Sequence, residues 1–271
     1  MAHRVEMGGQ PWRGLALATT LLACSACADS GPGTTEGTDD AALVAWGFTG
    51  VEYQADLDAS LYGRVLDNGV LLGNVVAALA GQTAGTARLL YTGCDPRPDP
   101  RQCDLGDVDV APFLEVMASV GTVEFGSPTA FDDLAEFDVV IADFCFAPYA
   151  LAETLDVLRE YYDGGGHVLV LADDFCFLRD PIRPDNPSLA RSTGDIANDF
   201  VEPLGVRFLQ GSPSRPDPFT VPTGERTGLL AGVRELDLHS VAPVEITGAQ
   251  AEPIVETPFG TMGAVVRRSS P

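Results

Sequence analysis

The sequence DVVIADFCF at residues 138–146 is followed by a second, similar stretch, HVLVLADDFCF, at residues 167–177. Each stretch is a continuous apolar run that leads into one or two aspartates and then Phe-Cys-Phe. Continuous apolar runs of this length are typical of strands that are buried on both faces of a parallel sheet. A helix-like segment and a glycine turn separate the two stretches. We therefore expect a β-α-β unit with both DFCF tails at the same end of the sheet.

Strand-like and helix-like segments alternate on either side of this unit, which indicates an α/β fold with a parallel sheet and helices on both faces. Helices are expected where apolar residues recur at spacings of three and four, at about residues 68–79, 109–120, 148–162 and 195–204. Strands are expected at about residues 42–48, 87–92, 123–125 and 206–209. Residues 211–271 are rich in Pro, Gly and Thr and predict a small antiparallel β edge.

The length and composition favour one folded domain. The chain has 271 residues, of which 45% are hydrophobic, and this is enough for one sizeable core. We assign the domain to residues 41–271, with its core at about residues 87–210. The formal net charge of −23 repels phosphate backbones, which argues against nucleic acid as a partner.

The N-terminal residues 1–23 are predicted to be an export signal. A weakly basic start precedes an apolar run that is too short to span a bilayer and that ends in Leu21-Leu22-Ala23-Cys24. This tetrapeptide resembles the bacterial lipobox, which implies that Cys24 is lipidated and becomes the first mature residue. An ordinary signal peptide that is cleaved nearby is the alternative. The sequence leaves open whether translation starts at Met1 or at Met7.

The residues after the lipobox predict where the protein resides. By resemblance to lipoprotein sorting rules, Ser25 in place of an aspartate directs the protein to the outer membrane. Several acyl chains would anchor it stably in that membrane. Residues 24–40 are small, polar and acidic, and are expected to form a flexible tether. We therefore expect an exported, lipid-anchored protein on the periplasmic or the surface face.

Two further stretches carry a family resemblance: YALAETLDVLREYYDGGGHVLVLADD at residues 149–174 and ANDFVEPLGVRF at residues 197–208. They are similar to class I glutamine amidotransferase-like domains, especially the non-catalytic branches such as ThuA-like and gliding-motility-type domains. The resemblance covers about residues 87–240 and implies a three-layer flavodoxin-like fold. In such domains a helix follows the last strand, and residues 67–81 look like that helix. A circularly permuted chain and an extra N-terminal βα unit are both open.

The resemblance also bears on catalysis. Catalytic members of the superfamily need a cysteine on a glycine-flanked elbow, with a downstream histidine and a carboxylate. Here phenylalanines flank Cys176, and they cannot easily adopt that strained turn. His3 leaves with the signal and His167 lies at the other end of its strand, so His239 is the only remaining histidine. The pattern therefore predicts a domain without glutaminase activity.

Cysteines of the folded part predict two disulfides, because export places them in an oxidising compartment. Cys94 and Cys103 flank a proline-rich loop and are expected to pair. Cys145 and Cys176 follow the two neighbouring strands, which lie about 4.8 Å apart and so within reach of a disulfide. A redox pair or metal thiolates are the alternatives, although none of the spacings matches a zinc site.

Carboxylates and aromatic rings accompany these cysteines at the sheet edge where open α/β sheets bind ligands. The candidate binding residues are Asp143, Asp173, Asp174, Phe146 and Phe177. The carboxylates could contact sugar hydroxyls, hold a divalent cation through hard oxygen ligands, or only cap loop and helix N–H groups. The rings could stack on a ligand or pack beneath the loops.

Together these observations predict a lipid-anchored cell-envelope protein whose non-catalytic α/β domain binds a protein or a carbohydrate. We expect no cofactor, and a divalent cation is the one exception that the aspartates leave open. The alternative is a metal-dependent hydrolase, in which the strand-end aspartates hold an ion that activates water. Arg267 and Arg268, close to the C-terminal end, are expected to be solvated.

Overall fold

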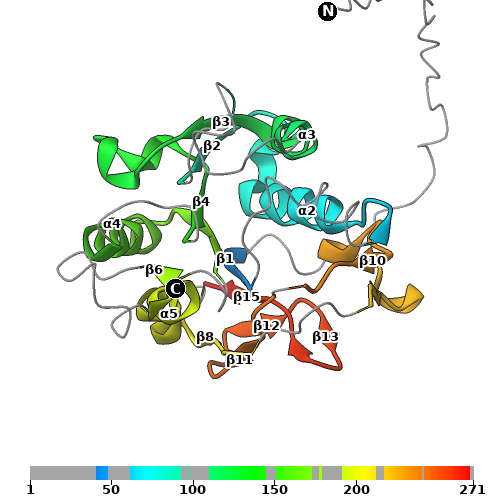
Figure 1. Cartoon of the computed structure of the whole chain (residues 1–271). Helices are drawn as coiled ribbons and strands as arrows, with labels where there is room; N and C mark the ends of the chain where they lie inside the picture. The colour runs from blue at the N-terminus through cyan, green and yellow to red at the C-terminus, as the bar shows by residue number, and fades with distance from the viewer. Residues whose placement is uncertain are drawn as a thin grey trace, which may run out of the picture. The chain divides into compact units, whose positions relative to one another are not determined.

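The computed structural model describes residues 41–47, 62–92, 97, 110–144, 151–172, 177–178, 191–211, 217–239 and 241–268. These residues form an α/β domain in which a central sheet lies between two layers of helices (Figure 1). Within the same ranges, no helix has the length and apolar character that crossing a membrane requires.

Seven strands form the main sheet, in the order β12-β15-β1-β5-β4-β2-β3. The first five strands of the chain pair in parallel: β1 (Ala41–Trp46), β2 (Ala87–Tyr91), β3 (Gly121–Phe125), β4 (Val139–Asp143) and β5 (His167–Leu171). Antiparallel pairing then adds β15 (Ala264–Arg267) next to β1, and β12 (Ala251–Pro253) next to β15. The sheet is therefore mixed, with a parallel centre and an antiparallel edge.

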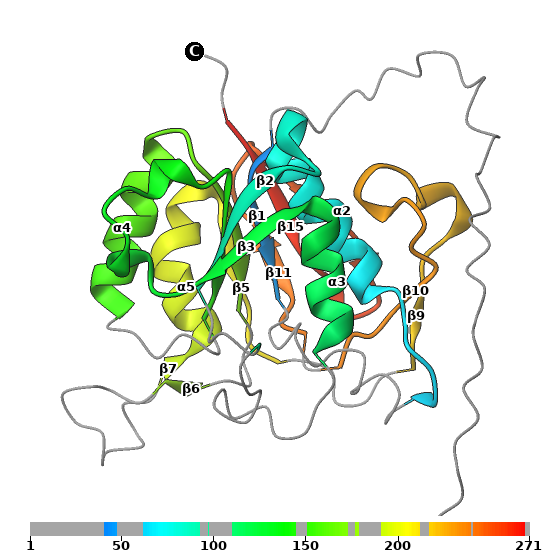
Figure 2. The same ribbon diagram turned by 90° about the horizontal axis from the view of Figure 1, so that it is seen from above.

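The α-helices cover both faces of this sheet. Figure 2 shows α2 (Asn68–Ala80) and α3 (Ala111–Val120) on one side, and α4 (Leu151–Asp163) and α5 (Thr193–Val201) on the other. Each face has its own apolar core, because strand side chains alternate between the two faces. Three layers follow from this arrangement, as the alternation of segments in the sequence predicts.

Short elements complete the domain. The 3-10 helices are η2 (Gly81–Thr83), η4 (Pro128–Ala130), η5 (Leu134–Glu136), η7 (Glu202–Leu204), η8 (Thr223–Glu225) and η9 (Gly228–Leu230). A small antiparallel sheet has the order β13-β14-β11-β8, from Glu256–Thr257, Gly260–Thr261, Val244–Ile246 and Val206–Phe208. Two further pairs are β9 (Phe219–Thr220) with β10 (Glu235–Leu236), and β6 (Phe177–Leu178) with β7 (Arg191–Ser192).

The strand order answers the question of permutation that the sequence leaves open. If counting starts at β2, the five parallel strands have the order 2-1-3-4-5, which is that of flavodoxin-like sheets. In this count β1 is the fifth strand, although it comes first in the chain. The helix α2 that follows β1 packs beside α3, as a helix after the fifth strand should. The domain is thus flavodoxin-like with a circularly permuted order of elements.

The predicted elements are largely confirmed. Each of the four predicted helices is present, with ends that shift by at most three residues. The small antiparallel β edge near the C-terminus is also present, but its strands β12 and β15 belong to the main sheet. The core consequently extends beyond residues 87–210, because β1 pairs with β5 on one side and with β15 on the other.

The turn between α4 and β5 depends on its glycines. Gly165 has a φ of 106°, which only glycine adopts without strain. A Cβ on Gly166 would lie 2.2 Å from the ring of Tyr161, which packs against the turn. The hydroxyl of Tyr161 donates to the backbone oxygen of Phe137 at 2.8 Å, so the ring ties α4 to the segment that enters β4.

Candidate functional site

The carboxyl ends of the parallel strands meet at one edge of the main sheet, which we call the carboxyl edge. Here β2 has β3 as its neighbour on one side and β4 on the other. The chain moves from β2 outward to β3 and then returns past β2 to β4, so the direction of strand addition reverses between β2 and β4. Ligands of open α/β sheets bind outside the carboxyl ends at such a reversal.

Two buried side chains meet at this reversal. The hydroxyl of Tyr91, the last residue of β2, donates to Oδ2 of Asp143, the last residue of β4, at 2.7 Å. Both residues are fully buried. The backbone N–H of Asp143 donates to Oγ1 of Thr92 at 3.1 Å, and the N–H of Thr92 donates to the oxygen of Ile141. Side-chain and backbone hydrogen bonds therefore bind the two strand ends together.

Aromatic rings hold Tyr91 in place. Its ring meets Phe113 of α3 at 5.3 Å and Phe125 of β3 at 5.5 Å between centroids, edge to face in both cases. The guanidinium of Arg97 lies 4.7 Å from the centroid of the Phe125 ring. Such edge-to-face contacts fix the orientation of each ring. The tyrosine hydroxyl is thereby aimed at Asp143 by contacts on the α3 side of the sheet.

The geometry suits Asp143 to a positioning role. A buried carboxylate is stable only when hydrogen bonds replace its hydration, and the Tyr91 hydroxyl supplies one of them. The next residue, Phe144, is also buried, and its N–H donates to the oxygen of Leu171 at 3.0 Å. The end of β4 is therefore a fixed platform from which the chain enters the carboxyl edge.

Several other predicted site residues lie outside the described part of the chain. These are Cys24, Cys94, Cys103, Cys145, Phe146, Asp173, Asp174 and Cys176. Phe177 lies in β6, where its backbone pairs with Ser192 of β7, and its side chain is not described. Both disulfides and the contacts of Asp173, Asp174 and Phe146 therefore stay predictions. The buried position of Phe144 supports packing for that ring, rather than stacking on a ligand.

The two DFCF motifs begin at different points relative to the strands that precede them. Asp143 is the Cα partner of Leu171, and each of these residues ends its strand. The second motif begins at Asp174, three residues beyond Leu171. The first motif therefore begins at the last residue of β4, whereas the second begins three residues after the last residue of β5.

A metal site is neither supported nor tested at the aspartates that the sequence predicts. Within the described ranges, no group of three or more His, Cys, Asp or Glu side chains is arranged to hold an ion. Asp173 and Asp174 lie outside those ranges, so a site that includes them stays a prediction.

Tyr91 and Thr92 were missed by the reading of the sequence. The signal that could have found them is the same one that selected Asp143: a polar group directly after a buried apolar run. The strand ARLLY ends in Tyr91, and Thr92 follows it. β2 carries no acidic residue at its end, so in the sequence it stands out less than the two strands that precede the DFCF motifs.

The opposite, amino edge holds the half-buried His167, at the start of β5 as its place in the sequence predicts. Burial lowers the pKa of His167, and the positive charge of Arg268 lowers it further. The backbone hydrogen bond and the charge of Asp138 act in the opposite direction. His167 thus lies at the end of β5 opposite to the carboxyl edge.

Arg268 caps the turn before β5. Its guanidinium donates to the backbone oxygens of Tyr162 at 2.8 Å, Gly165 at 2.6 Å and Gly166 at 2.5 Å. It also lies 4.9 Å from the centroid of the Tyr162 ring. The prediction that this arginine is merely solvated is therefore wrong, because its planar fork of donors meets three backbone oxygens that gather around the glycine turn.

His239, the other histidine of the folded part, belongs to a structural network. Its N–H donates to Oδ1 of the buried Asp237 at 2.7 Å, and the hydroxyl of Tyr62 donates to the same oxygen at 2.6 Å. The side chain of Asn68 both donates to and accepts from the backbone of Asp237. These bonds join the start of α2 to the segment that follows β10.

No protein-family model matches the chain, and neither the curated proteins nor the solved structures contain a significant match. The resemblance to class I glutamine amidotransferase-like domains therefore stays an inference from the sequence, alongside a strand order that fits the flavodoxin-like class.

Proposed function

We propose that the protein is a lipid-anchored protein of the bacterial cell envelope, and that its domain binds a ligand at the carboxyl edge without catalysing a reaction. The observation that supports the site most strongly is the buried pair of Tyr91 and Asp143, which fixes the strand ends where the sheet order reverses. Ligand sites of open α/β sheets occur at that place.

The ligand is a carbohydrate or a protein of the envelope. A chain with a net charge of −23 repels polyanions, whereas neutral sugars and basic proteins carry no such penalty. In this proposal Asp143 positions the platform. Asp173 and Asp174, with Phe146 and Phe177, make the contacts, because hydroxyl-binding carboxylates and stacking rings suit a sugar.

A binding assay tests the site. A lipid-free chain that starts after Cys24 would be titrated with peptidoglycan fragments, envelope polysaccharides and an extract of envelope proteins. The doubly substituted variant Asp173→Asn, Asp174→Asn should lose most of the binding. The control Asp132→Asn, Asp163→Asn removes the same charge near the amino edge and should retain it. Equal binding by the two variants would show that the carboxyl edge is not the site.

The same preparation distinguishes the hydrolase. Ca²⁺, Mg²⁺ and Mn²⁺ would be added in turn, and the midpoint of thermal unfolding and the release of cleaved fragments would be recorded. Binding without any metal-dependent cleavage is the expected result. If the wild type cleaved a fragment in the presence of a metal ion and the Asp173→Asn, Asp174→Asn variant did not, the protein would be a metal-dependent hydrolase instead.

Lipidation needs a separate experiment in the producing cells. Cys24→Ala should abolish incorporation of labelled fatty acid and release the protein from the membrane fraction. Cys27→Ala is the matched control, because it removes a neighbouring cysteine outside the tetrapeptide that resembles the lipobox. Unchanged labelling in Cys24→Ala would exclude the anchor while leaving the carboxyl-edge site open.

A further inference from the structure

A cavity of about 560 Å³ lies on the α2 face of the sheet, and neither Tyr91 nor Asp143 belongs to its lining. Its apolar lining includes Val44 of β1, Val265 of β15 and Val255, which follows β12. All three valines belong to the core that α2 and α3 share. The cavity therefore has an apolar floor that the main sheet provides.

The cavity exists because the sheet is wider than its helical layer. α2 packs on β1, β5 and β4, and α3 packs on β3. The antiparallel strands β15 and β12 continue the sheet beyond β1. On this face the segment with η8 and η9 takes the place of a further helix, and it supplies the outer wall with Leu229 and Leu230.

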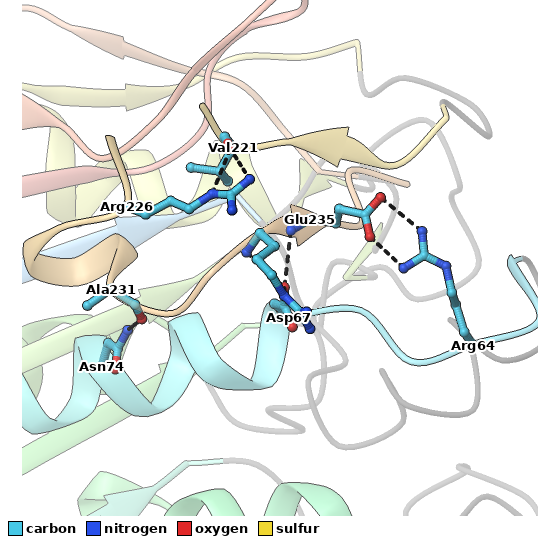
Figure 3. A network of polar contacts seen from close by, with 8 residues as sticks. Arg64, Asp67, Asn74, Val221, Arg226, Ala231 and Glu235 are labelled. Atoms are coloured by element: carbon cyan, nitrogen blue, oxygen red, sulfur yellow. Dashed lines mark hydrogen bonds and ion pairs between the residues drawn. The ribbon is translucent and has the colours of Figure 1, made fainter. Parts of the chain in front are cut away.

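Polar contacts fix this outer wall to α2. The side-chain amide of Asn74 donates to the backbone oxygen of Leu229 at 2.9 Å. It also donates to the backbone oxygen of Ala231 at 2.8 Å (Figure 3). The guanidinium of Arg226 donates twice to the oxygen of Val221, at 3.0 and 2.8 Å. The wall is thus held by α2 and by its own turn, and the cavity is built into the fold before any ligand arrives.

The same close-up shows a second anchor for this part of the chain. The carboxylate of Asp67, at the start of α2, accepts from the N–H of Arg234 at 2.8 Å and of Glu235 at 3.1 Å. Arg64 reaches Glu235 through two hydrogen bonds, at 2.5 and 2.9 Å. The segment that forms the wall is therefore fastened at both of its ends.

Charged side chains at the rim of the cavity give the rim a net negative charge. Glu225, Glu252 and Glu256 are exposed carboxylates among its lining residues, whereas Arg267 is the cation there. Arg267 already pairs with Glu252 at 3.0 Å. Glu256 accepts from the hydroxyl of Thr261, which leaves its negative charge in place. The rim thus carries an excess of negative charge over an apolar floor.

From this combination we propose that the cavity is a second binding site, which takes an apolar molecule that carries a positively charged group. The apolar part would lie on Val44, Val255 and Val265, and the cation would face Glu225 and Glu256. The volume is within the range of about 300–1,000 Å³ that is usual for small-molecule sites. The site is independent of the carboxyl edge and of the lipid anchor.

Two probes with the same alkyl chain and opposite head groups test the proposal: decyltrimethylammonium and decyl sulfate, both below their micelle concentrations. Binding to the lipid-free chain would be followed by calorimetry and by the methyl NMR signals of Ile254 and Val265. Decyltrimethylammonium should bind and shift those signals, and decyl sulfate should bind more weakly by about tenfold or more. Equal affinities, or shifts confined to other methyl groups, would overturn the proposal.

Variants separate the cavity from the general acidity of the chain. Glu225→Gln should lower the affinity for decyltrimethylammonium by about two- to fivefold, as expected for the loss of one exposed ion pair. Glu245→Gln removes the same charge from an exposed position on β11 and should leave the affinity unchanged. Ala78 lies on α2 at the cavity wall. Ala78→Phe should fill part of the cavity and lower the affinity for both probes. If a folded Ala78→Phe chain binds like the wild type, or if both glutamate variants behave alike, the cavity is not the site.

Discussion

The hydrogen bond between Tyr91 and Asp143 is the single contact that most clearly defines the carboxyl edge. It joins residues 52 positions apart in the sequence, and both are fully buried. A buried carboxylate that loses a donor suffers the cost of its own desolvation, which exceeds the net value of the hydrogen bond itself. The effect of removing the donor should therefore be larger than that of removing an exposed hydroxyl.

Tyr91→Phe should destabilise the domain by about 1–3 kcal/mol, because the ring packing is kept while Asp143 loses a donor. Urea unfolding of the lipid-free chain measures this. Tyr162→Phe removes a hydroxyl at a position where the ring supplies the packing, and it serves as the control. A loss no larger than that of the control would mean that the Tyr91 hydroxyl contributes little to the carboxyl edge.

His167 should make the stability depend on pH. Its pKa is lower in the folded chain than the ordinary value of 6.5, because burial and Arg268 disfavour the charged ring. The unfolded chain therefore binds more protons as the pH falls through the ordinary pKa, so stability falls on acidification and the loss levels off below the folded pKa. Asp138 opposes the shift, and Tyr161 packs at the same edge.

The comparison is between the wild type and His167→Gln, unfolded in urea at about pH 8 and at about pH 5.5. The wild type should lose more stability between the two conditions than the variant does. His239→Gln controls for the loss of a histidine, since it leaves His167 and Arg268 in place. Equal losses in all three chains would contradict the assignment to His167.

Among the elements, the turn between α4 and β5 depends on a residue from the far end of the chain. Arg268 follows β15, yet it donates to three backbone oxygens around the glycine turn. A guanidinium meets such a cluster with several donors at once, and the ring of Tyr162 supports it from one side. The antiparallel edge of the sheet thereby stabilises the parallel β-α-β unit.

Arg268→Ala should destabilise the domain by about 1–2 kcal/mol, because three backbone oxygens around the glycine turn lose the guanidinium donor. Arg268→Lys should recover only part of this, since one ammonium group cannot match the planar fork. The exposed Arg207→Ala on β8 is the control for the loss of one positive charge. Urea midpoints that are equal for the Arg268→Ala and Arg207→Ala chains would disprove a capping role.

The sequence predicts elements well where a single segment contains the whole signal. The spacing of Leu71, Leu72, Val75, Val76 and Leu79 defines α2 without any other part of the chain. The apolar runs of β4 and β5 are equally local. Short strands such as β12 and β13 carry too few residues for a periodic signal, so their place in a sheet depends on partners elsewhere.

The site was only partly predictable for a related reason. Asp143 could be selected because it directly follows an apolar run and strand ends gather at one edge. Its partner Tyr91 could not be assigned, because the pairing of β2 with β4 bypasses β3 and becomes apparent only in the sheet order. The three-residue offset between the two DFCF motifs likewise depends on the register of β4 and β5.

At the scale of the whole molecule, the permuted strand order makes a prediction about connectivity. Ala41 of β1 and Arg267 of β15 are Cα partners on adjacent antiparallel strands. Neighbouring strands are about 5 Å apart, so a short loop can join these two ends. The connection between α2 and β2 would then be free to become the new terminus, as in a flavodoxin-like chain that begins with its first strand.

A chain that begins at Gly85, with residue 268 linked to residue 41 by about four residues and ending at Thr83, should fold into the same sheet. Far-UV circular dichroism and one cooperative urea transition would show this. A chain opened within β4, between Val140 and Ile141, is the control and should fail to fold, because the opening interrupts a central strand. If the two chains behaved alike, the inferred equivalence of β1 to a fifth strand would be wrong.

The position of β1 also determines when the domain can assemble during synthesis. The strand is made first, but its two ladder partners are residues 168–171 of β5 and residues 264–267 of β15. A nascent chain therefore carries the apolar segment of β1 without ladder partners until β5 has been made. Contacts of such long sequence separation slow folding and leave the strand available to chaperones. Completion of the sheet must wait for β15, which follows the other six strands of the main sheet in the chain.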